Sequence, residues 1–322
     1  MKLGVLTVLF GDKPLNEVCA YLKGLGVETV EIGCGGFPGK AHCDPAKLLA
    51  DEKALDRFLA DIKGNGLEIS ALACHGNMVH PDKEIAAGYI ADFKNAVLLA
   101  EKLGIDTVVT FSGCPGDCSD SKYPNWVTCP WPEDFLAILD YQWNEVLIPF
   151  WKEMAAYCRS HGVTRIAFEM HPGFCVYNPE TLLKLRKAVG EEIGANFDPS
   201  HLIWQGMDPV AAIRELRGAI YHFHAKDTKI DRYNAAKNGV LDTKHYGDEA
   251  NRAWIFRSVG YGMNEQAWRE MMSELVLAGY DRSVSIEHED SLMAPEEGLE
   301  KAIELLKRVL IRNGKPTEMW WA

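Results

Sequence analysis

The sequence predicts an α/β protein of the (β/α)8 barrel (TIM barrel) class, and two observations support this prediction. Short runs rich in β-branched residues alternate about eight times with longer segments of helical periodicity along the 322 residues. Alternating strands and helices are typical of parallel sheets, and eight such units in one chain favour a closed barrel over an open sheet. In addition, no Gly-x-Gly-x-x-Gly run opens a helix after the first predicted strand, as a dinucleotide-binding sheet requires. With no linker or low-complexity segment, residues 1–322 are expected to form a single domain.

The predicted strands are short, and most end in a polar residue. In chain order they are Leu3–Leu9, Thr29–Ile32, Glu68–Ala73, Thr107–Phe111, Arg165–Glu169, Ile193–Asp198, Ile220–His224 and Val284–Glu287. Between them, apolar residues recur at three-and-four spacing, as Leu139, Val146 and Phe150 do within Phe135–Cys158. Proline in a first turn beside an acidic residue, as at Asp208-Pro209, marks several helix starts because its missing N–H needs no partner there.

Two connections are long, and both follow predicted strands. They are Ser112–Trp131, after the fourth strand, and Ala225–Met263, after the seventh. Loops that follow strands lie at the catalytic face of a barrel. Loops of this length in a compact domain are usually functional, so we expect both to cover the active site.

Polar residues stand where the last four predicted strands end: Glu169, Asp198, His224 and Glu287. The carboxyl ends of barrel strands meet at one mouth, where active sites are built. Residues two apart share a strand face, so side-chain alternation tests whether these four point inward. The residues two positions earlier are small or polar, whereas the intervening positions hold large apolar side chains suited to packing against helices. These intervening residues are Phe168, Phe197, Phe223 and Ile286.

Three carboxylates and an imidazole at one point would repel one another without a cation. This oxygen-rich set suits one hard or borderline divalent ion, with Mn²⁺ expected first and Mg²⁺, Co²⁺ or Zn²⁺ as alternatives. Four protein ligands would leave about two positions of an octahedron for substrate oxygens. The alternative is that these residues only cap helices or form ion pairs, and it weakens when four successive strands show the same pattern.

Four runs of residues carry a resemblance to a known family. They are Phe168-Glu169-Met170-His171-Pro172-Gly173, Asn196-Phe197-Asp198-Pro199-Ser200-His201, His222-Phe223-His224-Ala225-Lys226-Asp227 and Ser285-Ile286-Glu287. Together they resemble the xylose isomerase-like TIM-barrel superfamily. Within it they are similar to the sugar phosphate isomerase/epimerase group, near ketose 3-epimerases and the inositol-catabolic isomerases and dehydratases. The resemblance covers essentially the whole chain and is specific for the superfamily rather than for a substrate.

The resemblance implies roles for individual residues. Glu169, Asp198, His224 and Glu287 match positions that bind one divalent metal ion in that family. The two matching glutamates also act there as acid and base on the bound ketose. The position matching His201 contacts substrate oxygens.

The resemblance implies a divalent-metal-dependent sugar isomerase or epimerase that acts on a ketose or keto-sugar, and the residues suit such a mechanism. A metal bound to a carbonyl and its neighbouring hydroxyl acidifies the adjacent C–H and stabilises the resulting enediolate, while carboxylates move the proton. Ketose 3-epimerases carry an arginine a few residues past the seventh-strand histidine, where this chain has Ile230. A lyase on the same scaffold is therefore kept as the alternative. It would be a dehydratase acting on an inosose or an enzyme that eliminates an aglycone from a 3-keto-glycoside.

Further residues are candidates for substrate binding, each with a structural alternative. His75 ends the third strand with inward parity, and Lys226 is placed to pair with a substrate oxygen or with Glu287. Trp126 and Trp204 are candidates for stacking on a sugar ring, although tryptophan is more often a core residue. Other candidates have second roles to weigh. His171 and His222 are expected to orient ligands, and Glu31 either faces the mouth or serves as a cap or ion-pair partner.

Composition restricts the partners and the compartment. The formal net charge of −12 disfavours nucleic acid, whose binding needs basic surface, and no run of 18 apolar residues predicts a membrane span. Nine cysteines, an odd number, do not suggest a disulfide framework and favour a reducing, cytoplasmic compartment. No glycine-rich phosphate loop follows the last two strands, which favours an uncharged carbohydrate substrate.

Other interpretations have less support. An apurinic endonuclease would need three metals and a basic face, and a non-catalytic sugar-binding barrel would not need the glutamate pair. A zinc site at Cys114, Cys118 and Cys129 has irregular spacing and no clear fourth ligand. Trp320 and Trp321 near the end of the sequence suggest docking on this subunit or on a partner, so a homo-oligomer stays open.

Overall fold

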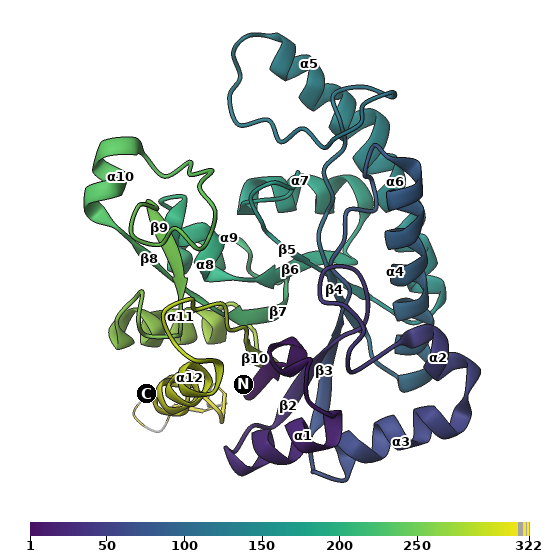
Figure 1. Ribbon diagram of the computed structural model, residues 1–322, viewed down its shortest axis with the longest axis vertical. Coiled ribbons are helices and arrows are strands. Elements are labelled where there is room, and N and C mark those ends of the chain that lie inside the picture. The colour runs from purple at the N-terminus through teal and green to yellow at the C-terminus, as the bar shows by residue number, and fades with distance from the viewer. Residues whose placement is uncertain (315–317, 320, 322) are drawn as a thin grey trace.

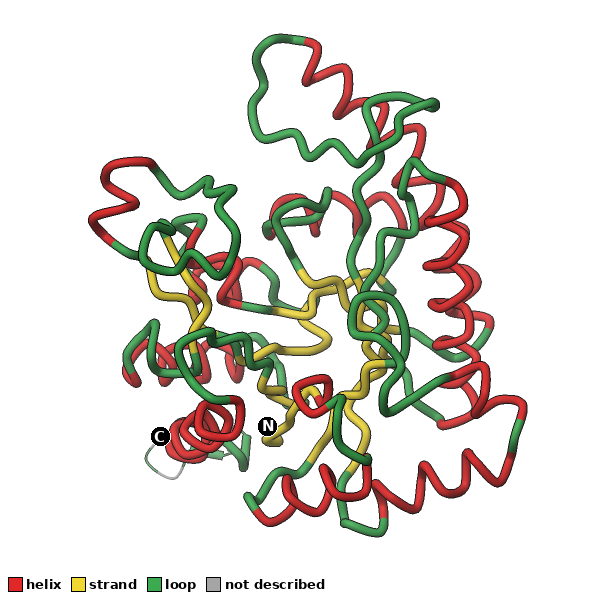
Figure 2. Tube along the Cα trace, in the orientation of Figure 1, coloured by secondary structure: helices red, strands yellow, loops and turns green. Residues whose placement is uncertain are grey.

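The computed structural model describes residues 1–314, 318, 319 and 321, and eight parallel strands close into a barrel. Their order around the barrel is β1-β10-β7-β6-β5-β4-β3-β2, drawn yellow in Figure 2. The strands are β1 (Lys2–Leu6), β2 (Thr29–Gly33), β3 (Glu68–Ala73), β4 (Thr107–Thr110), β5 (Arg165–Glu169), β6 (Ile193–Phe197), β7 (Ile220–Ala225) and β10 (Ser283–Ile286). The predicted barrel class is therefore confirmed.

Helices surround this barrel (Figure 1). They are α1 (Leu15–Gly24), α2 (Pro45–Ala50), α3 (Glu52–Lys63), α4 (Lys83–Leu103), α5 (Asp134–Asp140), α6 (Ile148–Ser160), α7 (Pro179–Val189), α8 (Pro199–Trp204), α9 (Pro209–Glu215), α10 (Arg232–Asn238), α11 (Glu265–Leu277) and α12 (Pro295–Val309). A π-helical segment, η2 (Tyr141–Leu147), joins α5 to α6, so the helix predicted over Phe135–Cys158 runs through three labelled elements. The predicted helix start at Asp208-Pro209 is confirmed, because Asp208 caps α9 and Pro209 occupies its first turn.

The first strand is shorter than the predicted Leu3–Leu9. It ends at Leu6, and the 3₁₀ turn η1 (Thr7–Phe10) follows. The last residue of β1 that pairs with β2 is Leu6, which lies opposite Glu31. The turn instead buries Phe10, whose ring contacts Tyr21 edge-on at 5.7 Å. Packing against α1 therefore replaces strand pairing beyond Leu6.

The alternation of side chains along the last four strands is as predicted. Phe168 packs outward against Trp151 of α6, with ring centroids 4.5 Å apart, and Phe197 stacks on Phe223 at 5.6 Å. The other face points into the barrel, where Asn196 donates a hydrogen bond to Glu169 over 3.2 Å. Because parity is fixed by the strand, the residues that close these strands are aimed at the barrel axis.

The long connection after β7 differs from the expected irregular loop. Residues predicted as the loop Ala225–Met263 contain an antiparallel hairpin, β8 (Asp227–Ile230) and β9 (Trp254–Arg257), together with α10. Asp227 joins the two ends of this excursion by accepting N–H groups from Gly260, Gly262 and Met263. A Cβ at position 262 would lie 2.2 Å from the Thr228 carbonyl oxygen, so only glycine fits this close approach.

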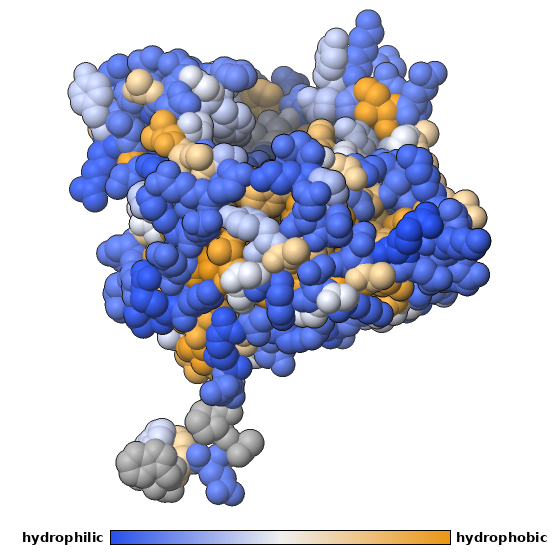
Figure 3. All heavy atoms as spheres, turned by 60° about the horizontal axis from the view of Figure 1, so that its bottom comes forward, coloured by the Kyte–Doolittle hydropathy of each residue, from blue (hydrophilic) through white to orange (hydrophobic). Residues whose placement is uncertain are grey.

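The connection after β4 is irregular up to residue 133 and then enters α5. In Figure 1 this segment and the β8–β9 excursion rise from the barrel as two separate projections. The face in Figure 3 is mostly hydrophilic, with hydrophobic residues in scattered spots. Among the described residues, no helix is long and apolar enough to cross a membrane.

All nine cysteines lie in the described part of the chain and are free thiols, as their odd number suggested. Cys118 and Cys129 are exposed, and Cys114 is buried. No group of potential metal ligands found among the described residues includes a cysteine. The docking role suggested for the terminal tryptophans involves Trp320, which lies outside the described residues.

Candidate active site

Four side chains from four strand ends meet at the barrel mouth. Glu169 closes β5, Asp198 follows β6, His224 lies in β7 and Glu287 follows β10. One ligand atom from each lies within 4.8 Å of every other, and the first three residues are buried. The structure therefore brings together the four residues that the sequence predicted to bind a metal, which we call the four-ligand cluster.

The two carboxylate oxygens of Asp198 have different surroundings. It is the N-cap of α8, and its Oδ1 accepts the N–H of Ser200 over 2.8 Å. Its Oδ2 is buried and makes no hydrogen bond among the described residues. The helix start thus turns Oδ2 toward the cluster, where burial raises the pKa of this carboxyl to about 7.

His224 is oriented by a buried carboxylate on its far side. Its Nε2 lies 2.9 Å from Oε2 of Glu31, a residue of β2 that is 0% exposed. Ser285 donates to the same carboxylate over 2.8 Å. Because Glu31 accepts the Nε2–H, the lone pair of a neutral His224 ring is on Nδ1, which faces the cluster.

Nδ1 of His224 lies 2.8 Å from Glu287 Oε2 and 3.1 Å from Glu169 Oε2. Nevertheless it makes no hydrogen bond of acceptable direction among the described residues. Two buried polar atoms of the cluster, this nitrogen and Oδ2 of Asp198, therefore make no hydrogen bond among the described residues. A buried polar atom without a partner is costly. The residues present thus fit a divalent cation, which would satisfy both atoms.

Lys226 is the main positive charge beside the cluster. Its buried Nζ donates to Glu287 over 3.0 Å and to Glu289 over 3.2 Å, and it lies 3.1 Å from Oδ2 of Asp198. Burial alone would raise the pKa of Glu287, but the Lys226 ammonium holds it well below its usual range. The same carboxylates raise the pKa of Lys226 despite its burial, so the lysine stays charged.

Glu169 is held by hydrogen bonds to both of its oxygens. Oε1 lies 3.0 Å from Nε2 of His201, and Oε2 lies 3.2 Å from Nε2 of His75. Burial would raise the pKa of Glu169, but Lys226 and the surrounding imidazoles lower it well below its usual value. At neutral pH this glutamate is therefore an oriented carboxylate.

A cavity of about 170 Å³ opens over the cluster. Glu169 and Glu287 line it, whereas Asp198 and His224 do not. The opposite wall is largely apolar and consists of Leu6, Val8, Phe37, Pro38 and Phe111. Glu289 lines it as well, so the cavity exposes three carboxylates on one side and an apolar surface on the other.

The predicted substrate-binding residues fall into three positions. His75 and Lys226 line the cavity. His201 is 1% exposed and lies behind Glu169, outside the lining. Trp126 and Trp204 line a separate pocket of about 180 Å³. Contact between these three outer residues and substrate therefore stays a prediction.

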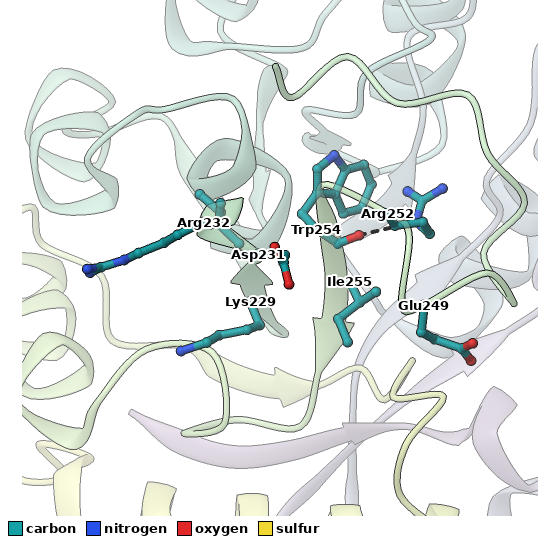
Figure 4. Close-up of a pocket in the computed structure, with 8 residues that line it drawn as sticks. Lys229, Asp231, Arg232, Glu249, Arg252, Trp254 and Ile255 are labelled. Atoms are coloured by element: carbon teal, nitrogen blue, oxygen red, sulfur yellow. Dashed lines mark hydrogen bonds between the residues drawn. The ribbon is translucent and has the colours of Figure 1, made fainter. Parts of the chain in front are cut away.

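Two further hollows lie near the β8–β9 excursion. One, of about 450 Å³, is lined in part by His171 and Glu289, which also line the cavity over the cluster. The other, of about 310 Å³, is lined by charged residues of both signs and shares no lining residue with that cavity. Figure 4 shows it, with Lys229 and Arg232 on one side and Glu249 and Arg252 on the other.

Some residues of the site have no clear signal in the sequence. The sequence leaves Glu31 either at the mouth or as a cap or ion-pair partner, because its contact with His224 joins strands far apart in the chain. Glu289 follows Glu287 by two positions and is distinguished only by its contact with Lys226. Phe37 reaches the site because Gly36 adopts φ +63°, and a Cβ there would lie 1.8 Å from the His75 carbonyl oxygen.

Residues 19–309 match the model of a protein family described as the xylose isomerase-like TIM barrel. The chain belongs to this family. It is 39% identical over 312 residues to the uncharacterized protein YfiH of Bacillus subtilis, covering 96% of this chain and 99% of that one. It is 37% identical over 238 residues to the rhizopine catabolism protein MocC of Rhizobium meliloti, covering 72% and 63%. The resemblance inferred from the strand-end motifs is therefore confirmed.

Several solved structures superpose on the chain. One is D-psicose 3-epimerase from Clostridium cellulolyticum H10, with a TM-score of 0.63, 15% identity, and 96% and 99% coverage of the two chains. Another is the IolI protein with a bound zinc atom, with a TM-score of 0.65, 18% identity, and 96% and 98% coverage. A third is the probable 3-DHS dehydratase AsbF from Bacillus anthracis, with a TM-score of 0.65, 18% identity, and 95% and 99% coverage. At these identities the likeness is one of fold.

Proposed function

We propose that the protein is a divalent-metal-dependent sugar isomerase or epimerase that acts on a ketose or keto-sugar. One observation carries this proposal. Of the four residues in the cluster, the two that line the cavity are the glutamates, Glu169 and Glu287. Asp198 and His224 lie beneath them as ligands only. Groups that hold a metal and also face the substrate are those that can move a proton at a substrate carbon.

The four-ligand cluster would hold the metal through Glu169, Asp198, His224 and Glu287. When bound there, a divalent cation would polarise a substrate carbonyl and its neighbouring hydroxyl. Three carboxylates and one imidazole favour Mn²⁺, and Mg²⁺, Co²⁺ and Zn²⁺ also accept such ligands. The zinc atom of the related IolI structure is consistent with a divalent ion in this fold.

The chain's own carboxylates supply the proton transfer. Oε1 of Glu287 accepts no hydrogen bond among the described residues and belongs to a side chain that is 17% exposed, so it is free to meet a substrate C–H. Glu169 is ionised and fixed by His201 and His75. We assign removal and return of the proton to these two glutamates. Return to the same carbon gives an epimer, and return to the former carbonyl carbon gives an isomer.

Proton exchange tests this function directly. The purified protein, stripped of metal and then supplied with Mn²⁺, is incubated with a panel of ketoses and keto-sugars in D₂O and followed by NMR. We expect deuterium to enter the carbon next to the carbonyl with the sugar skeleton retained, and we expect EDTA to stop it. Absence of both exchange and product across the panel with every candidate metal would contradict the proposal.

A lyase is the second candidate, and the 450 Å³ hollow beside the cluster favours it because a substituted sugar would fit there better than a free ketose. The same proton removal followed by loss of a β-substituent gives elimination. The D₂O experiment separates the two reactions. Release of water or of an aglycone identifies a lyase, whereas exchange without release identifies an isomerase or epimerase.

A further inference from the structure

A second cavity adjoins the one that contains the glutamates. It has a volume of about 450 Å³, compared with about 170 Å³ over the cluster. His171 and Glu289 belong to the linings of both, so the two spaces meet at these side chains. Small-molecule sites usually measure roughly 300–1,000 Å³. The cavity over the cluster falls below this range by itself, and the adjoining cavity extends the space for a ligand.

The β8–β9 excursion forms the wall of the adjoining cavity. Tyr246, Ile255 and Phe256 come from it, and Tyr246 stacks on Phe256 with ring centroids 5.8 Å apart and planes at 22°. Phe256 also contacts Lys226, whose Nζ lies 4.9 Å from its ring centroid and which pairs with carboxylates of the four-ligand cluster. The aromatic wall is thus continuous with the groups that contact the cluster.

This wall is fixed in place rather than free to collapse. Asp290 accepts both a guanidinium hydrogen bond from Arg257 over 3.0 Å and the N–H of Ser258 over 2.8 Å, which ties the end of β9 to the segment after β10. The guanidinium of Arg252, which is 2% exposed, lies 4.5 Å from the ring centroid of Tyr246. These contacts pre-organise a ring-binding surface before any ligand arrives.

The lining also indicates the chemistry of a ligand. No lysine or arginine lines this cavity among the described residues, so a phosphate would find no cationic partner there. Glu289 would repel a carboxylate, and it accepts from Lys226 through Oε2, which leaves Oε1 to accept from a hydroxyl. Aromatic faces with one acceptor and the hydroxyl of Ser291 suit an uncharged ring.

We propose that the adjoining cavity is a subsite for a second, uncharged ring, so that the substrate is a keto-sugar carrying a sugar or aryl group through a glycosidic bond. The keto-sugar part of this proposal rests on the proposed function. The second ring rests on the cavity, its aromatic wall and its lack of cationic groups.

Binding of stable ligands tests the subsite without turnover. The probes are D-fructose, cellobiose and 4-nitrophenyl β-D-glucoside, titrated calorimetrically into the Mn²⁺-loaded protein. Ser291→Trp fills the cavity and Tyr246→Ala removes half of the stacked pair. Tyr233→Ala is the matched control, because Tyr233 lies in the same excursion, is 74% exposed and does not line the cavity.

We expect both subsite variants to lower the affinity for the two-ring ligands at least tenfold relative to the affinity for D-fructose, with Tyr233→Ala unchanged. A larger effect on cellobiose identifies a sugar ring, and a larger effect on the nitrophenyl glucoside identifies an aryl ring. Equal losses for all three ligands, or no loss for the two-ring ligands in variants that keep the parent thermal stability, would overturn the subsite.

The outcome is separable from that of the proposed function. If Glu169→Gln leaves the D₂O exchange unaffected while the subsite variants still lose two-ring binding, the isomerase assignment fails and the subsite stands. If exchange depends on Glu169 but two-ring binding does not depend on residues 246 and 291, the subsite fails and the isomerase assignment stands.

Discussion

The two halves of the barrel mouth are chemically unlike. Strands β5, β6, β7 and β10 deliver the four-ligand cluster, whereas β1 and the segments that follow β1, β2 and β4 supply Leu6, Val8, Phe37, Pro38 and Phe111. Among the described residues that line the cavity from the apolar half, His75 alone is polar, and it contacts Glu169. One cavity therefore combines a charged side, which would hold a cation, with an apolar side that a substrate would cover.

The apolar half matters because electrostatic interactions strengthen when water is excluded. Oriented carboxylates then act on a substrate with little solvent to reorganise. The charged half in turn needs a second layer of polar contacts, such as Glu31 behind His224, to hold its groups in one arrangement.

The largest effect is expected when the charged half loses its proton carrier. Glu169→Gln keeps the shape of the side chain but removes its charge. The amide cannot accept the substrate proton, and it binds a cation more weakly than the carboxylate does. We expect kcat to fall about 10²–10⁴-fold, measured by deuterium exchange with saturating Mn²⁺. Glu304→Gln, an exposed glutamate of α12, is the control and should match the parent. Full activity in Glu169→Gln would exclude the proposed mechanism.

The next effect is a loss of stability in acid, caused by the buried His222 beside the cluster. Burial lowers the pKa of His222 to about 4, against 6.5 for the exposed ring. As pH falls, the unfolded chain therefore binds a proton at this histidine at a higher pH than the folded protein does. The free energy of unfolding should therefore fall as pH drops from about 6.5 to about 4, by up to about 3 kcal/mol for this group. Urea titrations with EDTA at pH 7 and pH 4.5 measure this fall. It should be smaller in His222→Gln, and an equal fall in both proteins would contradict the assignment.

A smaller loss is expected when the charged half keeps its ligands but loses their support. Glu31→Gln no longer accepts charge-assisted hydrogen bonds from Nε2 of His224, so Nδ1 is less well presented to a cation. Changes of this kind typically cost about 10–100-fold in metal affinity. Calorimetric titration with Mn²⁺ measures it, again with Glu304→Gln for comparison. Parent-like affinity would show that His224 needs no partner.

The smallest effect is expected in the apolar half. Phe37 is 61% exposed and touches the cavity, so Phe37→Ala removes an apolar contact to substrate without a large cost in stability. We expect KM to rise about tenfold, in line with roughly 1–1.5 kcal/mol for one aromatic contact, while Mn²⁺ affinity stays the same. A loss of metal affinity instead would mean that the two halves are not separable.

Much of the fold was predictable because it depends on local signals. Alternating strands and helices indicated the barrel, and strand parity indicated which residues at the ends of β5, β6, β7 and β10 point inward. The errors occurred where local signals are ambiguous. The apolar run Leu3–Leu9 continues past Leu6, although pairing of β1 with β2 ends there. The expected loop Ala225–Met263 contains a hairpin whose strands, β8 and β9, are separated by more than twenty residues.

The sequence by itself determined the family, the barrel and the four candidate metal ligands, because each depends on periodicity or on residues placed at successive strand ends. Only the tertiary structure decided which ligands face the cavity, that Glu31 orients His224, that Lys226 bridges carboxylates from different strands, and that Trp126 and Trp204 line a different pocket. These outcomes depend on contacts between segments far apart in the chain. Their geometry is set by barrel closure and by loop packing, which no local pattern encodes.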